Sequence, residues 1–157
     1  MPTEKRNTRF IKTVQEKRAG MYRTALVLLS RSQDAEDAVS GAVENVYRNL
    51  DSIRNEDALG AYLMRAVINV CKDMLKKRRR ELPVDDFAPY DKGEEDASPV
   101  WQYLTGLEQK YALVLVLKFS ENMTAKEIAH VLGIPEGTVS TRISRGLTLL
   151  KKQMEGR

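Results

Sequence analysis

Hydroxyl and guanidinium side chains recur on one helical face near the C-terminal end of the sequence. Such a face suits duplex DNA, because arginine donates to guanine edges, serine and threonine serve base or phosphate, and a helix fits the major groove. Carboxylates are almost absent from this face. The residues expected to contact the duplex are Thr138, Ser140, Thr141, Arg142, Ser144 and Arg145.

Two short helices joined by a sharp turn must position that face. Thr124 and Glu127 have the spacing of a capping box, which predicts a helix start at Thr124. Gly133 suits the left-handed residue that ends a helix, and Pro135 suits the first turn of the next. This pattern predicts a helix-turn-helix, although a solvated amphipathic helix at a bundle edge is the plainer alternative. The expected apolar stripe of the second helix is Val139, Ile143, Leu147, Leu150 and Met154.

Five consecutive cations at 76–80 end another predicted helix, which runs from about residue 57 to 80. Cations at a helix C-terminus complement its dipole. Because five exceed what capping requires, phosphate binding is favoured over a merely solvated end.

Charge is distributed in three blocks. The net charge of the 157 residues is +4, but residues 1–80 hold 17 Lys and Arg against 10 Asp and Glu, and residues 98–157 hold 8 against 5. Between them, residues 81–97 hold 1 against 7, with prolines and no apolar period, which indicates an extended acidic linker. We therefore expect an all-α protein with an N-terminal three-to-four-helix bundle at 1–80, a flexible acidic linker at 81–97 and a C-terminal four-helix domain at 98–157.

The N-terminal bundle is predicted from apolar residues at helical spacing. Helices are expected at about 4–30, where Gly20 is a point of bending or breaking, at 34–50 with Asp34 as N-cap, and at 57–80. Tyr47 and Tyr62 fall on the apolar faces. A further run at 107–120 is apolar on more than one side, which leaves a strand open but favours a buried helix.

Several classes of protein are disfavoured by composition. No apolar run approaches the ~20 residues of a membrane span and the N-terminus lacks a signal-peptide core, so we expect a cytoplasmic protein without membrane insertion. The single cysteine, Cys71, excludes an internal disulfide and a multi-cysteine zinc site, and its helical position favours a packed thiol. One histidine, His130, and no triad-like grouping or phosphate loop make an enzyme the least favoured class. No catalytic residue, metal, cofactor or small-molecule substrate is expected.

Several motifs in order resemble the extracytoplasmic-function (ECF) class of bacterial RNA polymerase sigma factors. These are DAEDAV at 34–39, VYRNLDSIR at 46–54, AVIN at 66–69 before the basic run, the acidic linker, and GIPEGTVSTRISR at 133–145. The resemblance covers nearly the whole chain. It implies a partner, core RNA polymerase, and a target, promoter DNA.

The resemblance also implies roles for individual residues. Asp34, Glu36 and Asp37 would bind the clamp of the largest polymerase subunit, and the loop at 51–56 with the following helix would read and melt the minus-10 element. The helix-turn-helix would read the minus-35 element, its other face resting on the flap of the second-largest subunit, while the linker enters the polymerase cleft. The residues implied in the melting region are Asn69, Lys72, Lys76, Lys77 and Arg78.

One departure from the family pattern is visible, and two other functions stay open. Ser40 and Gly41 stand where the family often has Gln-Glu, which puts the strength of clamp binding in question. The family implies an anti-sigma partner, for which the apolar region 107–119 is a candidate site. The alternatives are a stand-alone helix-turn-helix regulator that binds duplex DNA as a dimer, and a purely helical adaptor.

Overall fold

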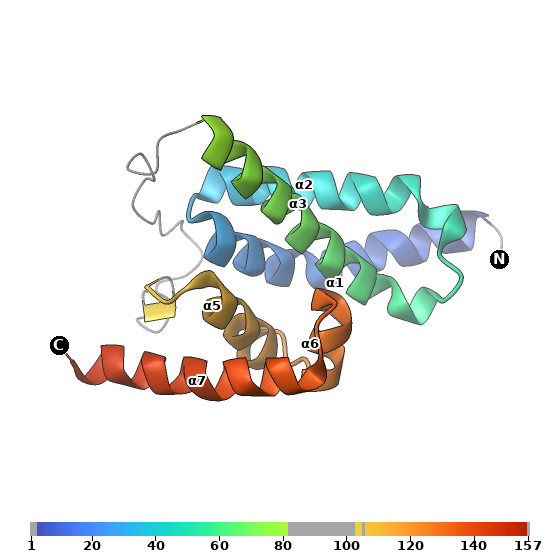
Figure 1. Ribbon diagram of the computed structural model, residues 1–157. Coiled ribbons are helices and arrows are strands. Elements are labelled where there is room, and N and C mark those ends of the chain that lie inside the picture. The colour runs from blue at the N-terminus through green and yellow to red at the C-terminus, as the bar shows by residue number, and fades with distance from the viewer. Residues whose placement is uncertain (1–2, 82–102, 105, 157) are drawn as a thin grey trace.

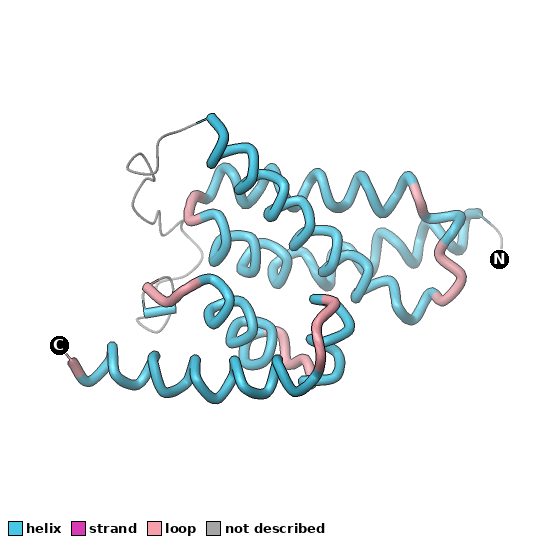
Figure 2. The backbone as a smooth tube through the Cα atoms, in the orientation of Figure 1, coloured by secondary structure: helices cyan, strands magenta, loops and turns pink. Residues whose placement is uncertain are grey.

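Helices form every regular element in the part of the chain that the structure describes. The structure is a computed structural model, and it describes residues 3–81, 103–104 and 106–156. Figure 2 shows helices joined by loops within these ranges. The predicted all-α class is confirmed. The predicted linker lies, after residue 81, outside the described residues, as does most of the predicted helix near residues 100–104.

Three long helices form the N-terminal bundle. They are α1 (Thr3–Leu29), α2 (Ser32–Arg48) and α3 (Leu59–Glu81), and each packs against the other two (Figure 1). Two 3₁₀ turns, η1 (Leu50–Ser52) and η2 (Glu56–Ala58), lead from α2 into α3. Apolar side chains at helical spacing are buried between the helices because that spacing places them on one face. They include Met21, Leu26, Leu29, Val39, Leu63, Val67 and Ile68.

Three details of the predicted bundle were wrong. Asp34 is not the N-cap, because α2 begins at Ser32 and Asp34 lies inside its first turn. The helix α1 runs unbroken through Gly20. Tyr47 and Tyr62 are 53% and 46% exposed. A tyrosine at the edge of an apolar face keeps its hydroxyl in water while its ring covers a neighbour, as Tyr47 does with its ring centroid 5.4 Å from that of Phe10.

The C-terminal unit, residues 103–156, contains α5 (Gln109–Leu115), α6 (Ala125–Leu132) and α7 (Glu136–Glu155). A π-helical turn, η4 (Val116–Ser120), extends α5, so the helix favoured at 107–120 is confirmed. Every residue from Tyr111 to Leu117 is buried. The reason is that α5 contacts α7 as well as α1 (Figure 1), which explains an apolar run without a single-sided period.

The predicted apolar stripe of α7 is correct only in part. Val139 is fully buried and Ile143 and Leu150 pack against the core, but Leu147 and Met154 are 41% and 46% exposed. The contact face passes through Gly146 instead, where an added Cβ would lie 3.1 Å from a methyl group of Leu115. A glycine at this position lets α7 approach α5 closely, and the packed face therefore turns away from Leu147.

The buried thiol of Cys71 gives a first prediction. Its side chain is fully buried, and burial raises the pKa of the thiol from an ordinary value of 9.0 to about 12. The neutral thiol is the stable form in the fold, so its contribution to stability is complete below pH 9 and is lost as pH rises toward 12. We expect iodoacetamide to leave Cys71 unmodified at pH 8 in the native protein and to alkylate it in denaturant. Alkylation at equal rates in both conditions would contradict the burial.

Candidate nucleic-acid interface

The helix-turn-helix formed by α6 and α7 has most of the local contacts expected from its sequence. The Thr124 N–H donates to Glu127 Oε1 at 2.9 Å, and the Glu127 N–H donates to Thr124 Oγ1 at 3.1 Å. These bonds to the Thr124 backbone and side chain hold the pKa of Glu127 below its ordinary value. Gly133 ends α6 with a φ of 69°, as predicted. Pro135 differs from its predicted place, because it precedes α7 in extended conformation, and its carbonyl accepts from Thr138 and Val139.

This turn presents one polar face of α7 to solvent. Ser140, Thr141, Ser144 and Arg145 are exposed, while Thr138 and Arg142 are half-buried at its edge. Carboxylates in α7 occur only near its two ends, at Glu136 and Glu155. The six residues predicted to contact duplex DNA therefore occupy one helix, and we name them the α7 surface. Four of them are fully available to a partner without any change of fold.

A shallow hollow adjoins the α7 surface. Its volume is about 340 Å³, and it is lined by Tyr111, Ser144, Arg145, Thr148 and Leu149. The Thr148 hydroxyl donates to the Ser144 carbonyl at 3.2 Å, so it is partly engaged within the helix. Arg145 lines the hollow and is exposed. Of the two arginines in the α7 surface, Arg145 is the more exposed candidate for a base contact.

A second basic surface follows the C-terminal half of α3. A groove of about 580 Å³, here named the α3 groove, contains three of the residues implied in melting, Asn69, Lys72 and Lys76. It also contains Arg79, which belongs to the basic run predicted to bind phosphate but not to the residues implied in melting. Helical spacing was the available signal, because offsets of three, four and three residues place these four side chains on one face. The remaining lining residues are Asp73, Leu75 and Gln109.

The other two residues implied in melting lie outside the groove. Lys77 is exposed on α3 but does not line the groove. Arg78 points into the bundle, where its Nη2 lies 2.5 Å from Asp34 Oδ2 and its Nη1 donates to the Leu29 carbonyl at 3.4 Å. The Arg78 side chain is 16% exposed and that of Asp34 28%. This ion pair joins two residues that the family resemblance assigns to different partners.

The three acidic side chains of α2 that were predicted to bind the polymerase also differ in their surroundings. Asp34 is held by Arg78, whereas Glu36 and Asp37 are exposed and line a groove between α1 and α2 with Arg18 and Ser40. Gly41 is not required by packing, since an added Cβ there would meet only a Val70 methyl at an ordinary 3.8 Å. Glu36 and Asp37 are thus exposed to a protein partner, and Asp37 Oδ1 also accepts from Gln33 Nε2 at 3.0 Å within α2.

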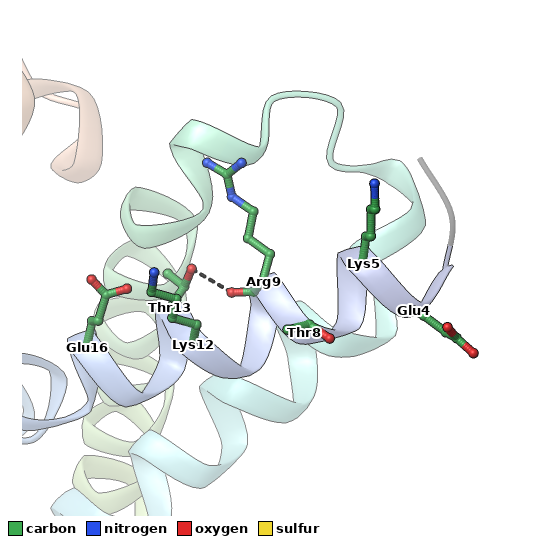
Figure 3. A pocket seen from close by; sticks show the side chains of 7 residues that line it. All are labelled: Glu4, Lys5, Thr8, Arg9, Lys12, Thr13 and Glu16. Atoms are coloured by element: carbon green, nitrogen blue, oxygen red, sulfur yellow. Dashed lines mark hydrogen bonds between the residues drawn. The ribbon is translucent and has the colours of Figure 1, made fainter.

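The loop before α3 is held against α1 by ion pairs that cannot be predicted from the local sequence pattern. Arg6 pairs with Asp51. The two terminal nitrogens of Arg9 lie 2.5 Å from Asp57 Oδ1 and 3.5 Å from Glu56 Oε2. Figure 3 shows Arg9 reaching from α1 toward this loop, beside a hollow that runs along the outer face of α1. The ends of the loop are therefore fixed from a distant part of the sequence.

Two features are absent from the described ranges. No three His, Cys, Asp or Glu side chains converge there as metal ligands. None of the helices in those ranges is long and apolar enough to cross a membrane.

Two family models match the sequence on either side of the predicted linker. The model described as Sigma-70 region 2 matches residues 13–81, which hold α2, α3 and most of α1. The model described as Sigma-70, region 4 matches residues 98–150, which hold the helix-turn-helix. The cations of the α3 groove thus lie within the region 2 match, and the α7 surface lies within the region 4 match.

Relatives extend the likeness over most of the chain. RNA polymerase sigma factor SigV of Bacillus subtilis is 25% identical over 146 residues, covering 90% of this chain and 88% of SigV. The ECF RNA polymerase sigma factor SigW of the same species is 29% identical over 154 residues, covering 85% and 82%. Among solved structures, the sigma factor RpoE of Bartonella quintana in complex with the anti-sigma factor NepR matches with a TM-score of 0.73 at 22% identity. That match covers 90% of this chain and 95% of RpoE, and it shows a shared fold.

Proposed function

This chain belongs to the sigma-70 family of RNA polymerase sigma factors, in the extracytoplasmic-function class, and from that premise we propose how it directs transcription initiation. One observation carries the proposal. Two separate basic surfaces occur in one chain: the cations of the α3 groove lie within the region 2 match, and the α7 surface lies within the region 4 match. A protein that binds two separate promoter elements needs two such surfaces.

The α7 surface is proposed to read the minus-35 element as duplex. Its exposed hydroxyls and guanidinium groups are suited to base edges and phosphates in the major groove. The opposite face of the C-terminal unit rests on the flap of the second-largest polymerase subunit. The half-buried position of Arg142 supports Arg145 as the principal reader.

The α3 groove is proposed to hold the melted minus-10 element. Lys72, Lys76 and Arg79 follow the strand backbone, and Asn69 on the same face contributes to a pocket for an extruded base. The loop at 51–56, fixed to α1 by Arg6 and Arg9, lies next to this helix in sequence and takes part in reading the element. Arg78 is retained as a weaker candidate, because strand contact requires it to leave Asp34.

Contact with the polymerase is proposed to run through α2. Glu36 and Asp37 dock on the clamp of the largest subunit, and Asp34 contributes mainly by holding the first turn of α2 against α3. The acidic linker at 81–97 enters the polymerase cleft. We also propose a cytoplasmic location, no enzymatic activity of its own, and an anti-sigma partner, since RpoE was solved with one.

Energetics explain why the chain needs the polymerase. Opening DNA costs on average ~1.4 kcal/mol per base-pair step. A small protein with few aromatic side chains to stack on bases cannot offset several such steps. Binding energy from the upstream contact and from the polymerase supplies the difference, while capture of a flipped base adds selectivity.

The proposed function is tested by mixing the purified chain with its cognate core polymerase. We expect it to comigrate with the core enzyme as a monomer and to direct initiation from specific fragments of its genome, and to open little or no promoter DNA alone. Binding of a palindromic duplex as a dimer without polymerase would instead identify a stand-alone regulator. If no genomic fragment is transcribed with the cognate core, the assignment fails.

A further inference from the structure

Two arginines of α1 hold the loop between α2 and α3 at both of its 3₁₀ turns. Arg6 pairs with Asp51 in η1. Arg9 pairs with η2, where its Nη2 lies 2.5 Å from Asp57 Oδ1 and its Nη1 lies 3.5 Å from Glu56 Oε2. Residues three positions apart lie on the same face of a helix, so both arginines act from one side of α1. We name Arg6 and Arg9 the α1 brace.

The α1 brace lies outside the part of the chain that matches the family model. The Sigma-70 region 2 match begins at residue 13, so Arg6 and Arg9 both precede it. Their carboxylate partners, at 51, 56 and 57, lie inside the match. The loop therefore belongs to the matched region, while the residues that hold it here come from the helix before that region.

The surroundings of Arg6 are not explained by stability alone. Its side chain is 23% exposed, whereas that of its partner Asp51 is 85% exposed. Ion pairs with so exposed a partner contribute little to the free energy of unfolding. In addition, Arg6 Nε is buried and has no hydrogen-bond partner within the described residues. A buried donor without a partner costs free energy and calls for an explanation, and a fixed position of the loop is the one we pursue.

Between its two braced turns, the loop presents hydrogen-bond donors. Ile53 packs against the core of the bundle, while Arg54 and Asn55 are exposed. Asn55 Oδ1 accepts from the Asp57 N–H at 3.0 Å, which fixes the Asn55 side chain and leaves its NH₂ group as a donor. The guanidinium of Arg54 is a second donor group. We name Arg54 and Asn55 the loop tip.

Donors of this kind distinguish bases only when they are held in place. Base edges differ in the position of their acceptor atoms, and arginine donates to two of them on guanine. A recognition site has to be held within about 0.5 Å of its productive geometry, whereas connecting segments are more mobile than the helices they join. An anchor at each end of the loop tip therefore supplies what base recognition by a loop requires.

The loop tip is near enough to the α3 groove for one strand to reach both. Leu59 begins α3 directly after η2, and Asn69 in the groove follows ten residues later. At the rise of an α-helix this is about 15 Å along the axis of α3, a distance that a few nucleotides of unstacked strand can span.

We propose that Arg6 and Arg9 are positioning residues for base recognition in the minus-10 element. They hold the loop tip in the place from which it discriminates between bases, and they do not contact DNA themselves. This role rests on the proposed function, in which the loop at 51–56 reads that element.

The hold on the loop is tested in the free chain. Arg6→Gln combined with Arg9→Gln removes both charges, and we expect amide hydrogen exchange at residues 51–57 to become about five-fold faster. That is the upper end for partly exposed ion pairs. Circular dichroism shows that the helices remain. Unchanged exchange at these amides in the double variant overturns the α1 brace.

The role in recognition is tested with core polymerase and a promoter that the wild-type holoenzyme selects from a pool randomised in the minus-10 element. We expect the double variant to bind core polymerase like wild type and to discriminate about five-fold less between the selected promoter and its single-base variants. Wild-type discrimination despite faster exchange overturns positioning. Equal loss of affinity for every promoter variant, with a lower salt slope, means that Arg6 and Arg9 bind phosphate directly and also overturns it.

A matched control and a charge swap make the test specific. Lys12→Gln removes an exposed α1 cation that has no ion pair to the loop among the described residues, and both readouts are expected to stay at wild type. Arg6→Asp alone is expected to lower discrimination, and Arg6→Asp with Asp51→Arg to restore it. An equal loss in Lys12→Gln, or a swap that restores nothing, overturns the pairing.

Arg54→Ala separates a reading residue from a positioning one. Because Arg54 belongs to the loop tip and holds no other part of the loop, we expect lower discrimination with unchanged hydrogen exchange. Wild-type discrimination in Arg54→Ala overturns the part assigned to Arg54. Hydrogen exchange is measured without polymerase or DNA, so a chain whose loop loosens in the double variant but which directs no transcription with its cognate core retains the α1 brace and refutes the proposed function.

Discussion

Replacing Lys72, Lys76 and Arg79 together by glutamine is expected to lower the affinity of the chain for single-stranded promoter DNA about 100-fold at 0.1 M salt. The three cations share the α3 groove and are exposed, so each can release a condensed counterion on meeting a phosphate. For single strands each such contact contributes about 0.7 to the slope of log affinity against log salt. The slope should therefore fall by about 2, as measured by fluorescence anisotropy of a labelled oligonucleotide across a salt series.

A matched variant separates the groove from the overall charge. Changing Lys5, Lys12 and Arg18 to glutamine removes the same charge from exposed positions of α1 that lie outside both basic surfaces. We expect a loss well below ten-fold, because charges more than a Debye length from the strand are largely screened at this salt. Equal losses in the two variants would mean that net charge alone binds DNA. A changed base preference in the groove variant would mean that these cations read bases.

Local features of the fold were predictable from sequence because their causes lie within a few residues. Thr124 and Glu127 satisfy each other's backbone donors across one helical turn, and Gly133 adopts a left-handed conformation that other residues reach only with strain. The long helices follow from apolar spacing alone. These causes act at short range, so the sequence pattern contains them in full.

Long-range partners were not predictable in this way. Asp34 looked like an N-cap because nothing nearby in sequence shows that Arg78, 44 residues later, takes its carboxylate. Gly20 looked like a point of bending or breaking because Glu121, whose close approach explains the glycine, is 101 residues away in sequence. Which face of a helix is buried also depends on the neighbour, as Leu147 and Gly146 illustrate.

The candidate site also combines features with short-range causes, which were predictable, and features with long-range causes, which were not. The cations of α3 and the hydroxyl groups of α7 could be predicted from residue types. Helical spacing also predicts that Arg79 lies on the same face as Lys72 and Lys76 and that Arg78 does not. Helical spacing does not predict that Gln109 lines the α3 groove. It also does not predict that Arg6 and Arg9 hold the loop before α3. Those contacts depend on how separate helices dock.

Arg145→Ala is expected to weaken binding of the upstream element by about 1–3 kcal/mol, or roughly 5- to 150-fold, if the guanidinium reads a base. Arg145 is exposed on the α7 surface, next to Ser144 and beside the hollow formed with Tyr111. The duplex for the measurement is selected by the wild-type holoenzyme from a randomised pool. Single-base variants of that duplex then show whether the loss is confined to one base pair.

Arg145→Lys distinguishes a base contact from a phosphate contact at the same position. A guanidinium donates through two parallel N–H groups to the guanine edge, whereas an ammonium is a point charge, so lysine should not restore discrimination at the base that Arg145 reads. At a phosphate, lysine should restore most of the affinity, and Arg145→Ala should lower the salt slope by about 0.9 without changing sequence preference. Lys151→Ala, which removes an exposed α7 cation that is not one of the six residues of the α7 surface, serves as the control. An Arg145→Ala chain that binds the selected duplex as tightly as wild type excludes Arg145 from the interface and leaves the half-buried Arg142 as the remaining arginine of the α7 surface.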